Sequence, residues 1–159
     1  MKRLTNILFL VLSLAILCCA MFSCNNGTVD ANDDGPDVAA TREVEELFSN
    51  YFNDLNNKNF SAIASYYSSD TNTEGMIASL EFNSSMFDIS YELESVVASF
   101  VDDGNIGATV DFKQTSKNLN NPSRVTVTME HHTYLIIKEN DAYVIKTMAV
   151  GEGDVISNS

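Results

Sequence analysis

The sequence has little cysteine, and all of it lies at the start of the chain. Of 159 residues only three are cysteines, Cys18, Cys19 and Cys24, and none occurs in residues 25–159. Beyond residue 24 the chain therefore has no disulfide, no thiolate metal site and no cysteine nucleophile. The sequence also lacks the glycine-rich phosphate loop, the G-x-S-x-G motif of serine hydrolases and the H-E-x-x-H motif of zinc proteases.

Basic residues are scarce too. The 9 lysines and arginines stand against 22 aspartates and glutamates, so the formal net charge is −13. Binding to nucleic acid needs a basic face that displaces counterions from phosphates, and we therefore exclude it. The same charge disfavours electrostatic docking of the domain onto an anionic membrane. Apolar residues make up 45% of the chain, which is enough for a hydrophobic core, and the length suits one domain.

Residues 1–23 have the layout of a secretory signal peptide. A positively charged start, Lys2-Arg3, precedes residues 7–22, in which every residue except Ser13 is apolar. Positive charge followed by an apolar run of this length is typical of a signal for export. A membrane-spanning helix is the alternative interpretation of the same run.

The end of this apolar run, Met-Phe-Ser-Cys at residues 21–24, resembles a bacterial lipoprotein signal. In such signals the cysteine after the cleavage point receives lipid and becomes the first residue. The resemblance implies that Cys24 carries acyl chains and anchors the protein to a cell membrane on its extracytoplasmic side. Two or more chains give a stable anchor where one does not.

Residues 24–40 are polar and acidic, which predicts a flexible tether after the lipid-bearing cysteine. Within this segment Asp30, Asn32 and Asp34 have the spacing of the first three oxygen ligands of a calcium loop. The final carboxylate ligand of such a loop is replaced by Thr41. A solvated linker is therefore the preferred interpretation, calcium binding is the alternative, and no other metal or cofactor is expected.

The folded domain is expected over residues 41–151, and it begins with helices. The first has an apolar side chain every three or four residues, which predicts one buried face; these residues are Val44, Leu47, Phe48, Tyr51, Phe52 and Leu55. A second helix is expected from Phe60 to Tyr67 and a short third one over residues 74–80.

Four strands are expected after the helices, over residues 86–101, 106–113, 124–137 and 142–150. Sequential strands joined by short turns form an antiparallel meander, which needs a cover on one face. The upstream helices are the available cover, so we predict an α+β fold with N-terminal helices on a curved four-stranded sheet. Residues 152–159 are expected to be a disordered tail.

Two stretches resemble a known family. Residues 44–60, VEELFSNYFNDLNNKNF, are similar to the first helix and break of the NTF2-like (SnoaL-like) superfamily of cone-shaped α+β domains. Residues 135–146, LIIKENDAYVIK, are similar to its final hairpin. The resemblance implies an apolar pocket between the helices and the concave face of the sheet.

Strand alternation nominates the residues that line this pocket. In the third strand the set that includes Met129 and His131 is more apolar than the set that includes His132, so we assign His131 inward unless a bulge reverses the faces. The candidates for the pocket are Tyr51, Phe52, Tyr67, Phe112, Met129, His131 and Val144.

His131 is then the one inward group suited to acid–base chemistry near neutral pH, and no inward carboxylate accompanies it. A hydrogen-bonded structural histidine is the preferred interpretation. We therefore expect a non-enzymatic, membrane-anchored protein that binds a small apolar ligand, a peptide or another protein, with a homodimer through the sheet as one option. The alternative is an NTF2-like isomerase, cyclase or dehydratase that uses His131 as acid and base.

Overall fold

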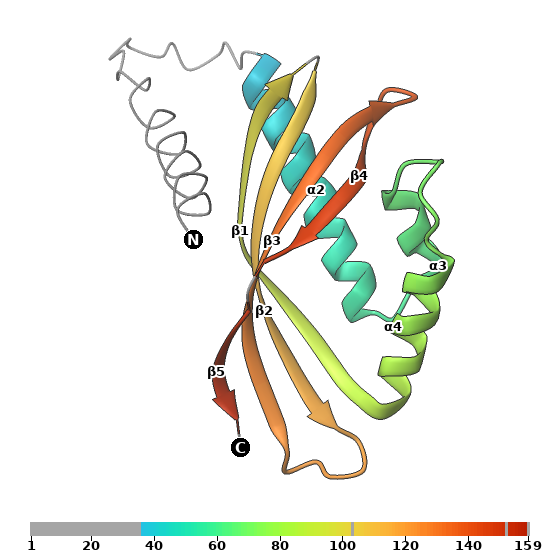
Figure 1. Ribbon diagram of the computed structural model, residues 1–159, viewed down its shortest axis with the longest axis vertical. Helices are drawn as coiled ribbons and strands as arrows, with labels where there is room; N and C mark the ends of the chain where they lie inside the picture. Colours follow the sequence, from blue (N-terminus) through green and yellow to red (C-terminus); the bar gives the residue numbers. More distant parts are fainter. Residues whose placement is uncertain (1–35, 103, 152, 159) are drawn as a thin grey trace, which may run out of the picture. The chain divides into compact units, whose positions relative to one another are not determined.

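The computed structural model describes residues 36–102, 104–151 and 153–158, with helices first and strands after (Figure 1). The signal peptide, the lipidation site Cys24 and the calcium ligands Asp30, Asn32 and Asp34 lie outside these residues. The helices are α2 (Pro36–Asn56), α3 (Phe60–Ile63), the 3-10 turn η2 (Ala64–Tyr66) and α4 (Glu74–Met86). The strands are β1 (Phe87–Asp102), β2 (Asn105–Asn118), β3 (Val125–Glu139), β4 (Ala142–Val150) and β5 (Asp154–Asn158).

The apolar face predicted for the first helix is confirmed, because Val44, Phe48, Tyr51, Phe52 and Leu55 are all buried in α2. The start of the helix differs from the prediction. Residues 36–40, which the sequence assigns to the tether, already belong to α2. Proline suits the first turn of a helix because it has no N–H to leave unpaired, and Ala40 is buried in the core.

The sheet is antiparallel in the order β1-β2-β3-β4, and it has a fifth strand that the sequence did not predict. β5 lies where we expected a disordered tail. β4 pairs only with residues 132–139 of β3, so the first half of the longer β3 has an open edge. β5 pairs with Thr126–Met129 at this edge and satisfies its backbone hydrogen-bonding groups.

The connection between β4 and β5 passes close to β3. The Gly151 N–H donates a hydrogen bond of 2.8 Å to the His131 carbonyl oxygen. A Cβ atom at Gly151 would lie 2.2 Å from that oxygen, and one at Gly153 would lie 2.7 Å from the Glu130 carboxylate. Glycine is therefore required at position 151, where the close atom belongs to the backbone of β3, whereas the flexible Glu130 side chain can move away from a Cβ at position 153.

The face of β3 that points toward the helices is the opposite of the predicted one. On β2 the alternate residues Ile106, Ala108, Val110 and Phe112 are buried, so Phe112 faces inward as predicted. Val110 pairs with His132 and Ala108 pairs with Tyr134, and side chains directly opposite each other in a sheet share one face. His132 and Tyr134 therefore point inward and His131 points outward. The more apolar set of β3 lies on the outer face.

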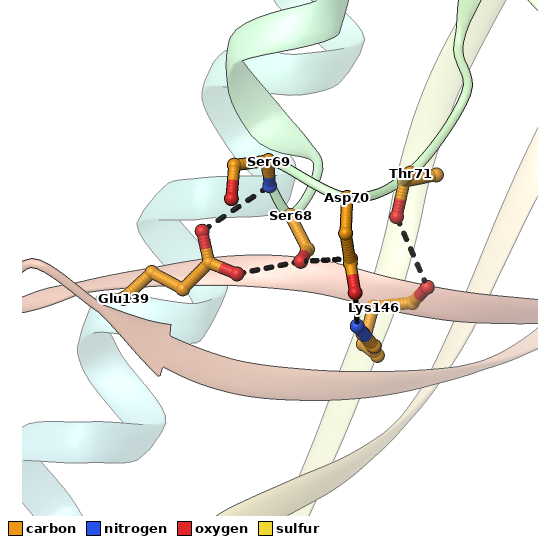
Figure 2. A network of polar contacts seen from close by, with 6 residues as sticks. All are labelled: Ser68, Ser69, Asp70, Thr71, Glu139 and Lys146. Carbon is orange, nitrogen blue, oxygen red and sulfur yellow. Dashed lines mark hydrogen bonds and ion pairs between the residues drawn. The ribbon is translucent and has the colours of Figure 1, made fainter.

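A polar network attaches the segment after η2 to the last hairpin (Figure 2). The buried Ser68 hydroxyl lies 2.5 Å from Glu139 Oε1 and 2.6 Å from Asp70 Oδ1, and it donates its single proton to one carboxylate at a time. The Ser69 N–H donates to the other Glu139 oxygen, and Lys146 forms an ion pair with Asp70. The network thus joins the helical layer to β3 and β4.

This network predicts loss of stability in acid. The ammonium of Lys146, and then the Ser68 hydroxyl, lower the pKa of Asp70, and hydrogen bonds from Ser68 and Ser69 lower the pKa of Glu139. The folded chain therefore holds its carboxylates ionised below about pH 4, where the unfolded chain takes up protons. Stability is full above the unfolded pKa values and is lost as pH falls through the folded ones. Urea unfolding midpoints measured between about pH 6 and about pH 3 should fall toward acid.

The matched variant for this prediction is Glu139→Gln, which keeps the shape of the side chain and removes one titrating group. Its unfolding midpoint should depend less steeply on pH than that of the natural chain. Equal pH dependence of the two proteins would contradict the role of Glu139 in the network.

Candidate functional site

A cavity of about 190 Å³ lies between the helices and the inner face of the sheet. Its walls come from six elements: α2, α4 and the strands β1, β2, β3 and β4. The lining residues are Tyr51, Phe52, Leu55, Met76, Leu80, Tyr91, Phe112, Gln114, His132, Tyr134 and Met148. A concave site with mostly apolar walls and a few polar groups is typical of a small-molecule site.

The aromatic walls of the cavity pack edge to face or tilted against one another. The Phe52 and Phe112 ring centroids are 4.8 Å apart, and the Phe112 and His132 rings are 4.9 Å apart at 86°. Burial raises the pKa values of Tyr51, Tyr91 and Tyr134, so these hydroxyls stay protonated. No aspartate, glutamate, lysine or arginine is among the lining residues.

His132 is the titratable group in the cavity wall that could act near neutral pH. Its Nδ1 lies 3.3 Å from the Tyr134 hydroxyl oxygen, and its Nε2 lies 3.8 Å from the Glu130 carboxylate. A neutral ring can accept from the tyrosine O–H at Nδ1 and direct its Nε2–H toward Glu130. Burial lowers the pKa of His132 more than Glu130 raises it, so the ring is neutral at neutral pH. Both ring nitrogens thus face protein groups.

Asn56 at the end of α2 fixes the position of Tyr91 in the cavity wall. Its side-chain Nδ2 donates to the Tyr91 carbonyl oxygen, and its Oδ1 accepts from the Tyr91 N–H, each at 2.8 Å. β1 is an edge strand, so these backbone groups have no neighbouring strand on that side. The amide of Asn56 takes the place of a strand there and joins the helix to the sheet.

The structure brings together only some of the predicted pocket residues. Tyr51, Phe52 and Phe112 line the cavity. Tyr67 is buried in the core beside them, where its hydroxyl lies 3.4 Å from that of Tyr51, but it does not line the cavity. The backbone of Tyr67 forms a parallel bridge with that of Ile145 on β4, and this bridge holds the tyrosine in the core.

Met129, His131 and Val144 were predicted to face the cavity, and this was wrong. Met129 and His131 lie on the outer face of β3, because they alternate with His132, which pairs with the buried Val110. A register shift between β3 and β4 places Ile145 opposite the buried Ile136 and Val144 opposite Ile137, so Val144 also points outward. Alternation alone cannot reveal such a shift.

Sequence reasoning missed most of the remaining wall. Met76 and Leu80 are four residues apart on α4, and this spacing could have indicated one face of a helix over the cavity. Gln114 continues the inward alternation of β2 beyond Phe112 and could have been found by the same rule. His132 and Tyr134 required the pairing of β3 with β2, which the sequence does not state.

On the outer face His131 has structural partners. Its Nδ1 lies 2.7 Å from Asp111 Oδ1, and the Ser95 hydroxyl donates to the other Asp111 oxygen at 2.9 Å. The His131 and Ser95 contacts lower the pKa of Asp111. These three residues come from β3, β2 and β1, and they connect the three strands across the outer face. These contacts agree with the structural, hydrogen-bonded role that we expected for His131.

Comparison with known proteins identifies the fold. No protein-family model matches the chain, and no curated protein is similar to it in sequence. The hexachlorocyclohexane dehydrochlorinase LinA-type3 from Novosphingobium barchaimii has a similar structure, with a TM-score of 0.63 and 10% identity over 77% of this chain and 90% of that one. A Caulobacter vibrioides protein with a cystatin-like fold gives 0.60 and 13% over 75% and 91%. ActVI-ORFA from Streptomyces coelicolor gives 0.56 and 14% over 71% and 96%.

These similarities show an NTF2-like, cystatin-like α+β fold, as the sequence resemblance implied. The fold is shared by enzymes and by proteins without a described activity, so it does not decide the function. Within the described residues no group of three or more histidine, cysteine, aspartate or glutamate side chains is placed to hold a metal ion. None of the helices described by the structure is long and apolar enough to cross a membrane.

Proposed function

We propose that this protein binds a small apolar molecule in the cavity between α2, α4 and the sheet. The observation that carries the proposal is the cavity of about 190 Å³ with aromatic and aliphatic walls and no lysine, arginine or carboxylate in its lining. An uncharged molecule enters such a site without the cost of burying a charge. Gln114 and the tyrosine hydroxyls offer hydrogen bonds to a polar end of the ligand.

The size of the cavity limits the ligand. An apolar protein cavity of about 150 Å³ is large enough to hold benzene. The present cavity therefore suits one ring with a short substituent, or an aliphatic molecule of similar volume. Larger ligands must extend beyond the cavity along the inner face of the sheet.

We also propose that this binding domain is carried outside the cytoplasm on a lipid anchor. The support is the signal-like residues 1–23, followed by Cys24 in the context of a lipoprotein signal. The domain keeps no free thiol after lipidation at this position, because residues 25–159 contain no cysteine. An apolar ligand would then be captured close to the membrane surface.

A second candidate function is acid–base catalysis in the same cavity, and the position of His132 favours it. Its neutral ring has the protonation state of a general base at neutral pH. Binding without reaction is better supported, because one ring nitrogen faces the Tyr134 hydroxyl and the other faces Glu130. Recovery of a bound molecule unchanged after long incubation supports binding, whereas its conversion by the natural chain but not by His132→Ala would favour catalysis.

Blocking the cavity should abolish binding of an apolar probe. Met148 lies on β4 in the cavity wall and is 41% exposed, so a Met148→Trp side chain can enter the cavity without replacing core residues. We expect the affinity for phenylbutanol, a neutral ring with a short chain, to fall about tenfold or more, because the probe loses its apolar contacts. Titration calorimetry on the full chain measures this change.

Thr147→Trp is the matched control. Thr147 neighbours Met148 but pairs with Leu135 on the outer face of the sheet. The same bulky side chain added there should leave the affinity for phenylbutanol unchanged. If both tryptophan variants bind as tightly as the natural chain, the cavity is not the binding site.

A further inference from the structure

A second hollow of about 180 Å³ lies at the end of the β2–β3 hairpin and is lined by three polar side chains, one basic side chain and one phenylalanine. Its lining residues are Phe87, Ser116, Asn118, Arg124 and Thr126. The Arg124 guanidinium makes no hydrogen bond or ion pair with any residue that the structure describes, although Arg124 lies in the wall of the hollow. Arg124 thus brings a guanidinium, a group with five N–H donors, to the wall of this hollow without an acceptor among the described residues.

The hollow lies on the same face of the sheet as the aromatic cavity. Gln114 lines the cavity, and Ser116 and Asn118 follow at steps of two residues along β2. The pairing of residues 114–118 with β1 and β3 has no register shift, so these side chains share one face. Gln114 and Ser116, one in the wall of each site, are two residues apart on β2, which corresponds to about 7 Å.

The charge of this region is opposite to that of the chain as a whole. Residues 112–129 contain three basic residues and no acidic one, in a chain whose net charge is −13. Lys113 is already paired with Glu92 on β1. Lys117 alternates with Ser116 and Asn118, so it belongs to the outer face. Arg124 is therefore the cation that remains for a ligand on the inner face.

The chemistry of the two sites is complementary. The aromatic cavity accepts an apolar group but has no cation to balance an acid. A guanidinium binds a carboxylate through two parallel N–H donors, and the hydroxyl of Ser116 can add a third. A ligand that occupies both sites must be apolar at one end and acidic at the other.

We propose that the ligand is an elongated apolar carboxylic acid, with its ring or tail in the aromatic cavity and its carboxylate on Arg124. This inference rests on the proposed function and adds the chemical class of the ligand. The distance between the sites requires a linker of a few carbon atoms between the apolar group and the carboxylate.

Phenylbutyrate and phenylbutanol test the inference, because they differ at the acidic end and share the ring and chain. Calorimetry on the full chain at neutral pH should show phenylbutyrate binding about tenfold or more tightly than phenylbutanol, since a charge-assisted bidentate contact is added. Arg124→Gln should remove this difference and leave phenylbutanol binding intact. Lys117→Gln removes the same charge from the outer face and should preserve the difference.

The outcomes separate this inference from the proposed function. Equal affinities of the natural chain for the two probes, with phenylbutanol still bound, would overturn the carboxylate site and leave the apolar cavity in place. An equal loss in Arg124→Gln and Lys117→Gln would also overturn it, because general attraction of the hairpin for anions would then explain the preference. Absence of binding by both probes would overturn the proposed function and this inference with it.

Discussion

Replacing Phe48 with alanine is expected to lower the free energy of unfolding by about 3–5 kcal/mol. Phe48 is fully buried in the middle of the α2 face, and its ring centroid lies 4.7 Å from that of Tyr134 on β3. Truncation removes the apolar contacts of a whole ring and leaves a void between helix and sheet. Domains of this kind have a total stability of only about 5–15 kcal/mol, so the effect is a large fraction of it.

Chemical denaturation with the matched variant Phe82→Ala checks this prediction. Phe82 lies on α4 and is 62% exposed, so the same change of residue type should alter stability by about 0.5 kcal/mol or less. The free energy of unfolding should depend on urea concentration with the same slope in all three proteins. The unfolding midpoint should fall in Phe48→Ala and stay at the natural value in Phe82→Ala. A loss of similar size in both variants would mean that the helix does not pack on the sheet as described.

Replacing Cys24 with alanine is expected to move the protein from the membrane fraction to the soluble fraction. The proposed lipid is attached to the thiol of this residue, and alanine cannot accept it. Each buried methylene of an acyl chain contributes about 0.8 kcal/mol to membrane binding, so loss of all chains removes the anchor. Fractionation of cells and mass spectrometry of the N-terminal peptide measure the location and the acyl groups.

Cys19→Ala is the matched control, because Cys19 belongs to the same apolar run but lies before the proposed cleavage point. This variant should stay in the membrane with its lipid. If the N-terminal peptide of the natural chain carries no acyl group on Cys24, the lipoprotein proposal is wrong.

The helical part of the fold could be predicted because its signal is redundant. The α2 face is set by six apolar residues at helical spacing, so an error at one of them would not change the conclusion. β3 carries no such redundancy. Val127 and Leu135 make its outer set apolar, while Tyr134 and Ile136 make its inner set apolar as well. Only the pairing with β2 decides which set faces the helices, and pairing is a long-range property.

The candidate site shows the same division between local and long-range information. Tyr51 and Phe52 follow from the helix period and Phe112 from the alternation of β2, so they could be named in advance. His132 could not be preferred over its neighbour His131, because the choice depends on strand register. β5 could not be predicted either, since its five exposed residues form a strand only because β4 leaves part of β3 unpaired.

The network around Ser68 has a consequence for the order of folding. Its bonds to Glu139 and the Asp70–Lys146 pair join residues 71 and 76 positions apart, and a parallel bridge joins Tyr67 to Ile145. Closing such long loops is entropically costly and slows folding. During synthesis the segment after η2 therefore has to wait for β4 to emerge before it is fixed. A nascent chain that stops before β4 should lack the Asp70–Lys146 pair and the Tyr67–Ile145 bridge.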